Sequence, residues 1–105
     1  MFSVNHKNQL NYRVNNQPSE VYLNHPTFGL LYRICLLKDN QELFTTLYAQ
    51  RLFFTVTASS NGFTFEPISR TDARMLVESL LRRFLLDRET EKHQQLQIIY
   101  KRTFL

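Results

Sequence analysis

Apolar, aromatic and β-branched residues gather in short runs through the middle of the chain, each bounded by residues that favour turns. The runs are Phe28–Leu37, Glu42–Tyr48, Arg51–Ala58 and Phe63–Glu66. Lys38-Asp39-Asn40 closes the first run, and Ser59-Ser60-Asn61-Gly62 precedes the last, where Asn-Gly tolerates the positive φ angles of a two-residue hairpin. No segment between the runs is long enough for a crossover helix, so the pattern predicts a small, bent antiparallel sheet or open barrel.

The connection between the second and third runs is very short. Little more than Ala49-Gln50 separates Tyr48 from Arg51, so we expect a tight reversal of the chain there. This reversal places Tyr48 and Arg51 at the tip of a hairpin.

The pattern changes to a helical period after Ser69. Ser69 is a favourable N-cap, and Asp72, three residues later, completes a variant of the capping box and suits the positive end of the helix dipole. Apolar residues then recur at helical spacing: Ala73, Leu76, Val77, Leu80, Leu81 and Phe84. The sequence predicts a helix that ends near Leu86-Asp87-Arg88.

A second, weaker helix is predicted from Glu89 to Arg102. The residues on its apolar side are Leu96, Ile99, Tyr100 and Thr103. The simplest interpretation is a helical hairpin. Because the apolar side of the second helix is small, we expect this helix to be able to detach when a partner binds.

Residues 1–19 have a different composition. They are rich in Asn and Gln, lack apolar periodicity and end in a Pro-Ser break, which predicts a flexible N-terminal extension. The alternative is an added edge strand, because Val4, Leu10, Tyr12 and Val14 roughly alternate with polar neighbours. The predicted organisation is an extension over residues 1–19, a β domain over residues 20–68 and a helical hairpin over residues 69–105.

Composition indicates a single functional unit with exposed aromatic side chains. The chain has 105 residues, and its nine Phe and five Tyr are more than so small a core can enclose. The net charge is +4, with most of the excess after residue 69, and this mild field favours acidic partners but is weak for a dedicated nucleic-acid binder. The arginines of the first predicted helix alternate with acidic residues, which favours a solvated, salt-bridged face over an acidic docking partner.

Residues that commonly carry catalysis or bind metals are not clustered in the sequence. His6, His25 and His93 are far apart, two glycines cannot build a phosphate-binding loop, and Cys35 lies in the most apolar run, where a thiol is normally inert. We therefore expect no catalytic residue, no metal and no cofactor. A single cysteine, with neither a membrane-spanning apolar run nor a leader-like start, favours the reducing cytoplasm.

His25 stands directly before Pro26 and has two interpretations. The histidine is either a polar anchor for the loop that leads into the first run, or merely part of a dipeptide that sets an extended backbone there. The second interpretation is favoured from the sequence.

With no catalytic residue, metal or cofactor expected, the residue types that are present favour binding to another protein. Tyr and Arg are typical of interface hot spots, because Tyr buries a large area with few torsions and Arg offers a planar fork of donors. A band of such residues runs along the predicted sheet: Tyr22, Phe28, Tyr48, Arg51 and Phe54. These side chains either face a partner or are covered by the helices as ordinary core, and periodicity does not choose between the two.

Several unusual strings carry a resemblance to a known family. They are Tyr22–Cys35 (YLNHPTFGLLYRIC), Glu42–Phe44 (ELF), Thr46–Phe54 (TLYAQRLFF), Phe65–Ile68 (FEPI), Ala73–Val77 (ARMLV) and Thr103–Leu105 (TFL). With them, the chain from Glu20 to Leu105 resembles the cyanobacterial PII-interacting protein X family. The resemblance implies an α+β fold, with a small bent antiparallel Tudor-like, KOW-like β-sheet domain followed by two C-terminal α-helices. Residues 1–19 have no counterpart in it.

The resemblance also implies a function. Family members are adaptors without a catalytic site that exchange between the PII trimer, which binds up to three copies, and NtcA, a dimeric CRP-type regulator of nitrogen genes. PII holds the adaptor when 2-oxoglutarate is low; when 2-oxoglutarate and ATP are abundant, PII releases it and it acts as a transcription coactivator that stabilises active NtcA. No small-molecule effector binds the adaptor directly, DNA is reached only through NtcA, and a further transcription regulator or RNA polymerase is left open as an additional partner.

The family's contacts with both partners carry across to named positions of this chain. These positions are Glu20, Tyr22, Phe28, Asp39, Tyr48, Arg51, Leu52 and Phe54. One shared patch implies that PII and NtcA compete for the adaptor. The alternative function is a KOW- or Tudor-type nucleic-acid-binding module that uses the basic C-terminal helices, and a small enzyme is the weakest hypothesis.

Overall fold

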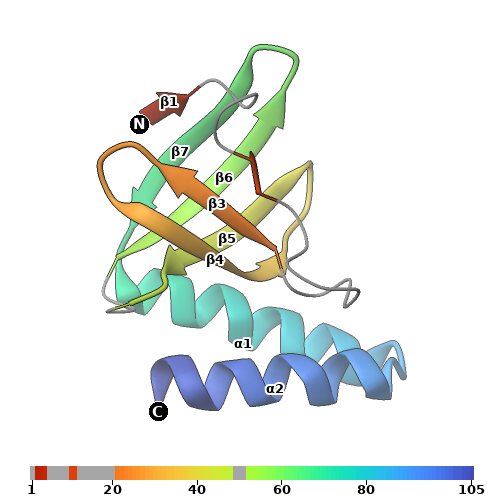
Figure 1. Cartoon of the computed structure of the whole chain (residues 1–105). Coiled ribbons are helices and arrows are strands. Elements are labelled where there is room, and N and C mark those ends of the chain that lie inside the picture. The colour runs from red at the N-terminus through yellow and green to blue at the C-terminus, as the bar shows by residue number, and fades with distance from the viewer. Residues whose placement is uncertain (1, 5–9, 12–20, 49–51) are drawn as a thin grey trace. The chain divides into compact units, whose positions relative to one another are not determined.

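The computed structural model describes residues 2–4, 10–11, 21–48 and 52–105. The chain divides into two compact units, a sheet unit over Met1–Ile68 and a helical unit over Ser69–Leu105 (Figure 1). Each unit is described below by itself.

Seven strands form one sheet among the described residues of the sheet unit. They are β1 (Phe2–Val4), β2 (Leu10–Asn11), β3 (Tyr22–His25), β4 (Gly29–Leu36), β5 (Gln41–Thr46), β6 (Phe53–Ser59) and β7 (Gly62–Ile68). The strand order is β1-β7-β6-β5-β4-β3-β2, and all neighbours run antiparallel. Figure 1 shows a strongly curled sheet, which confirms the predicted bent antiparallel fold.

Three strands were not among the predicted runs. β3 has only four residues, of which two are polar, so its sequence shows no clear alternation, yet it pairs with β4 from Tyr22 opposite Tyr32 to His25 opposite Gly29. β1 and β2 lie within residues 1–19 and pair with β7 and β3. For these strand residues the structure matches the edge-strand alternative, while the rest of that segment, including Tyr12 and Val14, is outside the described residues.

The core of the sheet unit is rich in aromatic side chains. Its main cluster consists of Val21, Leu23, Leu31, Phe44, Phe54, Val56, Phe63 and Phe65, with Phe28 packed against it. β6 is buried over four consecutive residues from Phe53 to Val56, so alternation along this strand does not reveal which side chains face inward. A bulge in β4 shifts the register between Arg33 and Cys35, and Ile34 and Cys35 are both buried.

The β4–β5 turn places two non-glycine residues in the left-handed region. Asp39 has φ 57° and Asn40 has φ 62°, and the N–H of Gln41 donates to the carbonyl of Lys38 at 3.0 Å. This is the geometry of a type I′ hairpin turn, which Asp and Asn tolerate better than most residues. In the β6–β7 turn, by contrast, the positive φ expected at Asn-Gly falls on Gly62 (121°).

The helical unit contains both predicted helices. α1 spans Arg70–Leu86 and α2 spans Thr90–Phe104. The Ser69 hydroxyl oxygen accepts the N–H of Asp72 at 3.0 Å, which confirms the predicted N-cap, and Arg88 at φ 57° lies in the connection between the helices. Neither helix has the length and apolar content needed to cross a lipid bilayer.

Polar contacts join the ends of the helical hairpin. The Arg70 guanidinium donates to the Phe104 carbonyl at 3.0 Å and to the Thr103 carbonyl at 3.4 Å, and it lies 5.4 Å from the centroid of the Phe104 ring. The Tyr100 hydroxyl donates to a carboxylate oxygen of Glu78, and this hydrogen bond raises the pKa of Tyr100. The two helices of the hairpin are therefore joined by Arg70 at the start of α1 and by the hydrogen bond between Tyr100 of α2 and Glu78 of α1.

Candidate partner-binding site

The β3–β4 turn and the segment after β5 lie at the same end of the sheet. His25 is opposite Gly29 at the start of β4, Leu31 is opposite Thr46 at the end of β5, and the N–H of Leu47 donates to the carbonyl of Leu30 at 3.0 Å. In Figure 1 both segments are on the left of the sheet unit. Candidate residues from these two segments are therefore neighbours although they are far apart in sequence.

Tyr48 and Leu52 are the exposed ones among the described candidate residues at this end of the sheet. Tyr48 follows β5 and is 88% exposed, and Leu52 precedes β6 and is 44% exposed. Large apolar surface so accessible is typical of residues that become buried against a partner.

Main-chain and hydroxyl contacts fix the base of the loop between these two residues. The N–H of Thr46 donates to the carbonyl of Leu52 at 3.1 Å, and the buried Thr45 hydroxyl donates to the same carbonyl at 2.8 Å. Residues 49–51, which include the candidate Arg51, are outside the described residues, as is Glu20. The predicted position of Arg51 at a hairpin tip therefore stays a prediction.

Phe28 and Phe54 form a pair in which only Phe28 reaches the surface. Their ring centroids are 5.2 Å apart; Phe28 is half-buried, whereas Phe54 is 1% exposed and belongs to the core cluster. A direct contact between Phe54 and a partner would require the ring to be uncovered. In the structure Phe54 supports Phe28 from below, and alternation could not reveal this because β6 is buried on consecutive residues.

Tyr22 and Asp39 extend the candidate set beyond this end of the sheet. Tyr22 is half-buried on β3 and its ring lies 5.5 Å from that of Tyr32. Asp39 is exposed in the β4–β5 turn, at the opposite end of β5 from Tyr48. The length of β5 separates the two by roughly 17 Å, and one partner surface of ordinary size, about 30 Å across, can span that distance.

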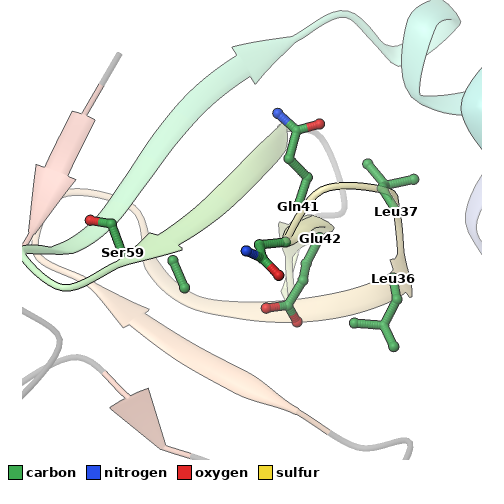
Figure 2. Close-up of a pocket in the computed structure, with 7 residues that line it drawn as sticks. Leu36, Leu37, Gln41, Glu42 and Ser59 are labelled. Atoms are coloured by element: carbon green, nitrogen blue, oxygen red, sulfur yellow. The ribbon is translucent and has the colours of Figure 1, made fainter.

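A depression next to the Asp39 turn was not predicted from the sequence. It has a volume of about 470 Å³, with Leu36, Leu37 and Ala58 as apolar lining and with Asn40, Gln41, Glu42 and Ser59 as polar lining. Figure 2 shows the two leucines on the side of the β4–β5 turn and Ser59 across from them. The sequence signal is the pair Leu36-Leu37 directly before turn residues, where one of two adjacent apolar side chains must face outward.

Within the part of the chain that the structure describes, the metal-binding residue types are dispersed and Cys35 is buried. No group of three or more His, Cys, Asp or Glu side chains is close enough to hold a metal ion within residues 2–4, 10–11, 21–48 and 52–105. Burial raises the pKa of the Cys35 thiol to about 12, so the reactive thiolate is not populated at neutral pH, as predicted for a core cysteine. Burial also lowers the pKa of His25, which favours the neutral form of its imidazole.

The charged residues of the helical unit are partly engaged with one another. Arg74 pairs with Glu78 at 3.8 Å, Lys92 pairs with Glu89 at 3.0 Å, and Arg82 donates to the Ser79 hydroxyl at 3.2 Å. These contacts agree with the favoured interpretation of a solvated, salt-bridged face, whose individual pairs contribute little to stability.

Comparison with known proteins identifies one family. The family model of PipX, described as PII-interacting protein X, matches residues 19–104. The search of curated proteins found no match. The family match includes β3 to β7 and both helices, and it begins after β1 and β2.

Proposed function

Because this chain belongs to the family of PII-interacting protein X, we propose that it is a nitrogen-regulation adaptor that binds PII and, alternately, the regulator NtcA. The family supports the coarser part of this function, an interaction with the signal protein PII in nitrogen regulation. We propose in addition that the adaptor exchanges between PII and NtcA and that this exchange depends on 2-oxoglutarate.

One observation carries the proposal: accessible apolar side chains lie on two segments that strand pairing brings to one end of the sheet. Tyr48 and Leu52 are exposed there, and Phe28 is half-buried in the β3–β4 turn at the same end. Aromatic side chains that are accessible in the free protein and supported by a rigid core beneath are the usual anchors of a protein interface. Asp39 and Tyr22 extend the proposed surface along the sheet.

A single surface for both partners makes the switch a competition. If PII and NtcA both cover Tyr48 and Leu52, only one of them binds a given copy of the adaptor at a time. The adaptor then needs no effector site, because 2-oxoglutarate and ATP change the affinity of PII and so the amount of adaptor left for NtcA. The adaptor activates NtcA to the extent that it binds the active conformation more tightly than the inactive one.

The experiment that tests this function is a titration of the full chain against PII by calorimetry, with ADP alone and with 2-oxoglutarate plus ATP. We expect binding in the first condition and a large loss of affinity in the second. The same protein is then titrated against NtcA with 2-oxoglutarate, and PII with ADP is added as a competitor. A stable ternary complex of adaptor, PII and NtcA would contradict the shared surface.

The second candidate, a nucleic-acid-binding module, is favoured by the basic excess of the helical unit. Residues 70–105 contain eight Lys or Arg and five Asp or Glu. Direct binding through several of these cations would weaken steeply with added salt. A gel shift with duplex DNA and single-stranded RNA at low salt distinguishes the two functions, and we expect no salt-sensitive shift.

A further inference from the structure

His25 is the last residue of β3 and is buried at the base of the β3–β4 turn. Its side chain is 4% exposed. The imidazole lies 4.9 Å from the Phe28 ring in a tilted arrangement, 4.9 Å from the Phe65 ring edge to face, and 6.2 Å from the Phe54 ring in a stack. The histidine thus touches both aromatic residues, Phe28 and Phe54, that were singled out for partner binding.

One nitrogen of His25 holds the backbone of that turn. Nδ1 accepts the N–H of Thr27 at 3.0 Å and the N–H of Phe28 at 3.2 Å. A nitrogen that accepts hydrogen bonds carries no proton, so the imidazole is neutral and its proton is on Nε2. The turn has only the three residues from Pro26 to Phe28 before Gly29, whose φ is 77°, so fixing two of its N–H groups holds the backbone from which the Phe28 side chain projects.

We propose that His25 is a positioning residue of the partner-binding surface: neutral Nδ1 holds the turn that presents Phe28, and a proton on Nδ1 releases it. The effect of His25 on partner binding rests on the proposed function. The effect of His25 on the β3–β4 turn does not, because it is measurable in the free protein. The favoured sequence interpretation, in which His25 merely extends the chain before Pro26, is replaced by the polar anchor.

The surroundings of the imidazole favour the neutral form. The neighbours from β6 and β7 are the rings of Phe54 and Phe65, and those from the turn are Thr27 and Phe28. Among the described residues of the packed strands, the charged groups are exposed or paired: Glu66 of β7 is exposed, and Arg33 of β4 is paired with Glu42 of β5 at 3.0 Å. Burial among aromatic rings disfavours a charge and lowers the pKa of His25.

Two substitutions separate the hydrogen bonds of His25 from its packing. His25→Asn keeps an acceptor at the position of Nδ1, because the Asn side-chain oxygen bonds the N–H groups two and three residues later in ordinary turns, but it loses the ring. His25→Phe keeps an aromatic ring but loses the acceptor nitrogen, so the N–H groups of Thr27 and Phe28 lose their hydrogen bonds to residue 25. If His25 acts by positioning the turn, His25→Phe weakens partner binding more than His25→Asn does. If it acts by packing, His25→Asn weakens binding more.

The first measurement is the dissociation constant for PII with ADP, together with amide exchange of Thr27 and Phe28 in the free protein. We expect His25→Phe to weaken PII binding about tenfold and to speed exchange at both amides, and His25→Asn to stay within about threefold of the wild type even though it lowers the melting temperature more. If His25→Asn is the weaker binder and His25→Phe binds normally, the histidine acts by packing and the positioning role is wrong.

The second measurement needs no variant and no partner. In an NMR titration of the wild-type chain, we expect the Thr27 and Phe28 amide resonances to shift with the same midpoint as the His25 ring, below pH 6.5. Amides that do not follow the ring would overturn the inference, whether or not the variants fold. If the wild type fails to bind PII while the amides do follow the ring, the proposed function fails and the positioning of the turn stands.

Discussion

In the sheet unit, Phe44, Phe65 and Val56 are 1% exposed or less, whereas the helical unit leaves several of its large apolar side chains exposed. Those more than half exposed are Met75, Leu85, Leu86, Ile98 and Leu105. The residues of α1 that are fully buried are small ones, Ala73 and Val77.

The difference teaches that the two units depend on different interactions. Burial of aromatic area stabilises the sheet, and its loss is costly wherever a large side chain is removed. The helical hairpin leaves more of its large apolar side chains exposed, so we expect directional contacts such as those of Arg70 with the end of α2 to hold a larger share of its stability. Substitutions of the same kind should therefore have unequal effects in the two units.

The largest effect is expected from Phe65→Ala in the sheet core. Phe65 is fully buried and contacts the rings of His25, Phe54 and Phe63. We expect a loss of about 3–5 kcal/mol in the free energy of unfolding, measured by urea denaturation. The matched change in the helical unit is Ile98→Ala, which is 64% exposed and should cost at most about 0.5 kcal/mol. Equal losses would remove the contrast between the units.

The next effect concerns binding and compares two equally accessible residues. Tyr48 is 88% exposed in the sheet unit and Leu86 is 83% exposed in the helical unit. We expect Tyr48→Ala to weaken PII binding by about 2 kcal/mol without changing the melting temperature, and Leu86→Ala to leave the affinity unchanged. Calorimetry with PII and ADP measures both. An unchanged affinity for Tyr48→Ala would exclude that residue as an anchor.

A smaller effect is expected where the helical hairpin is held by a charge. Arg70→Ala removes two hydrogen bonds to carbonyls of α2 and the contact with the Phe104 ring. We expect about 1–2 kcal/mol of local destabilisation, seen as faster amide exchange in the last turn of α2 with no change in β3 to β7. Arg83→Ala, an exposed arginine of the same helix, is the control and should leave exchange in α2 as it is.

The smallest effect is a pH dependence confined to the sheet unit. Because the folded pKa of His25 lies below 6.5, the unfolded chain takes up its proton first as the pH falls. The stability that the neutral imidazole contributes is complete above pH 6.5 and is lost as the pH falls through 6.5 to the folded pKa. Melting curves between pH 7.5 and 4.5 should therefore slope more in the wild type than in His25→Asn, and parallel slopes would contradict this assignment.

The elements that could be predicted from the sequence are those with a dense apolar run bounded by turn residues or with a helical period. α1 begins at its Ser69 cap, the apolar side of α2 contains the buried Leu96 and Thr103, and β4 to β7 correspond to the predicted runs. β3 escaped prediction because two of its four residues, Asn24 and His25, are polar, so the segment shows no apolar run. The exposure of Tyr48 agrees with the short spacing of the flanking runs, whereas the proximity of the β3–β4 turn to the segment after β5 needed the register of β4 against β5.

The sequence by itself determined the two kinds of unit, their boundary near Ser69 and the family, since capping, periodicity and unusual strings are local properties of the chain. Only the tertiary structure decided that Phe54 faces the core, that Asp39 lies at the far end of β5, and that His25 anchors a turn. The reason is physical: a strand's alternation assigns side chains to two faces, but pairing with distant strands decides which face is covered and which polar atom finds a partner.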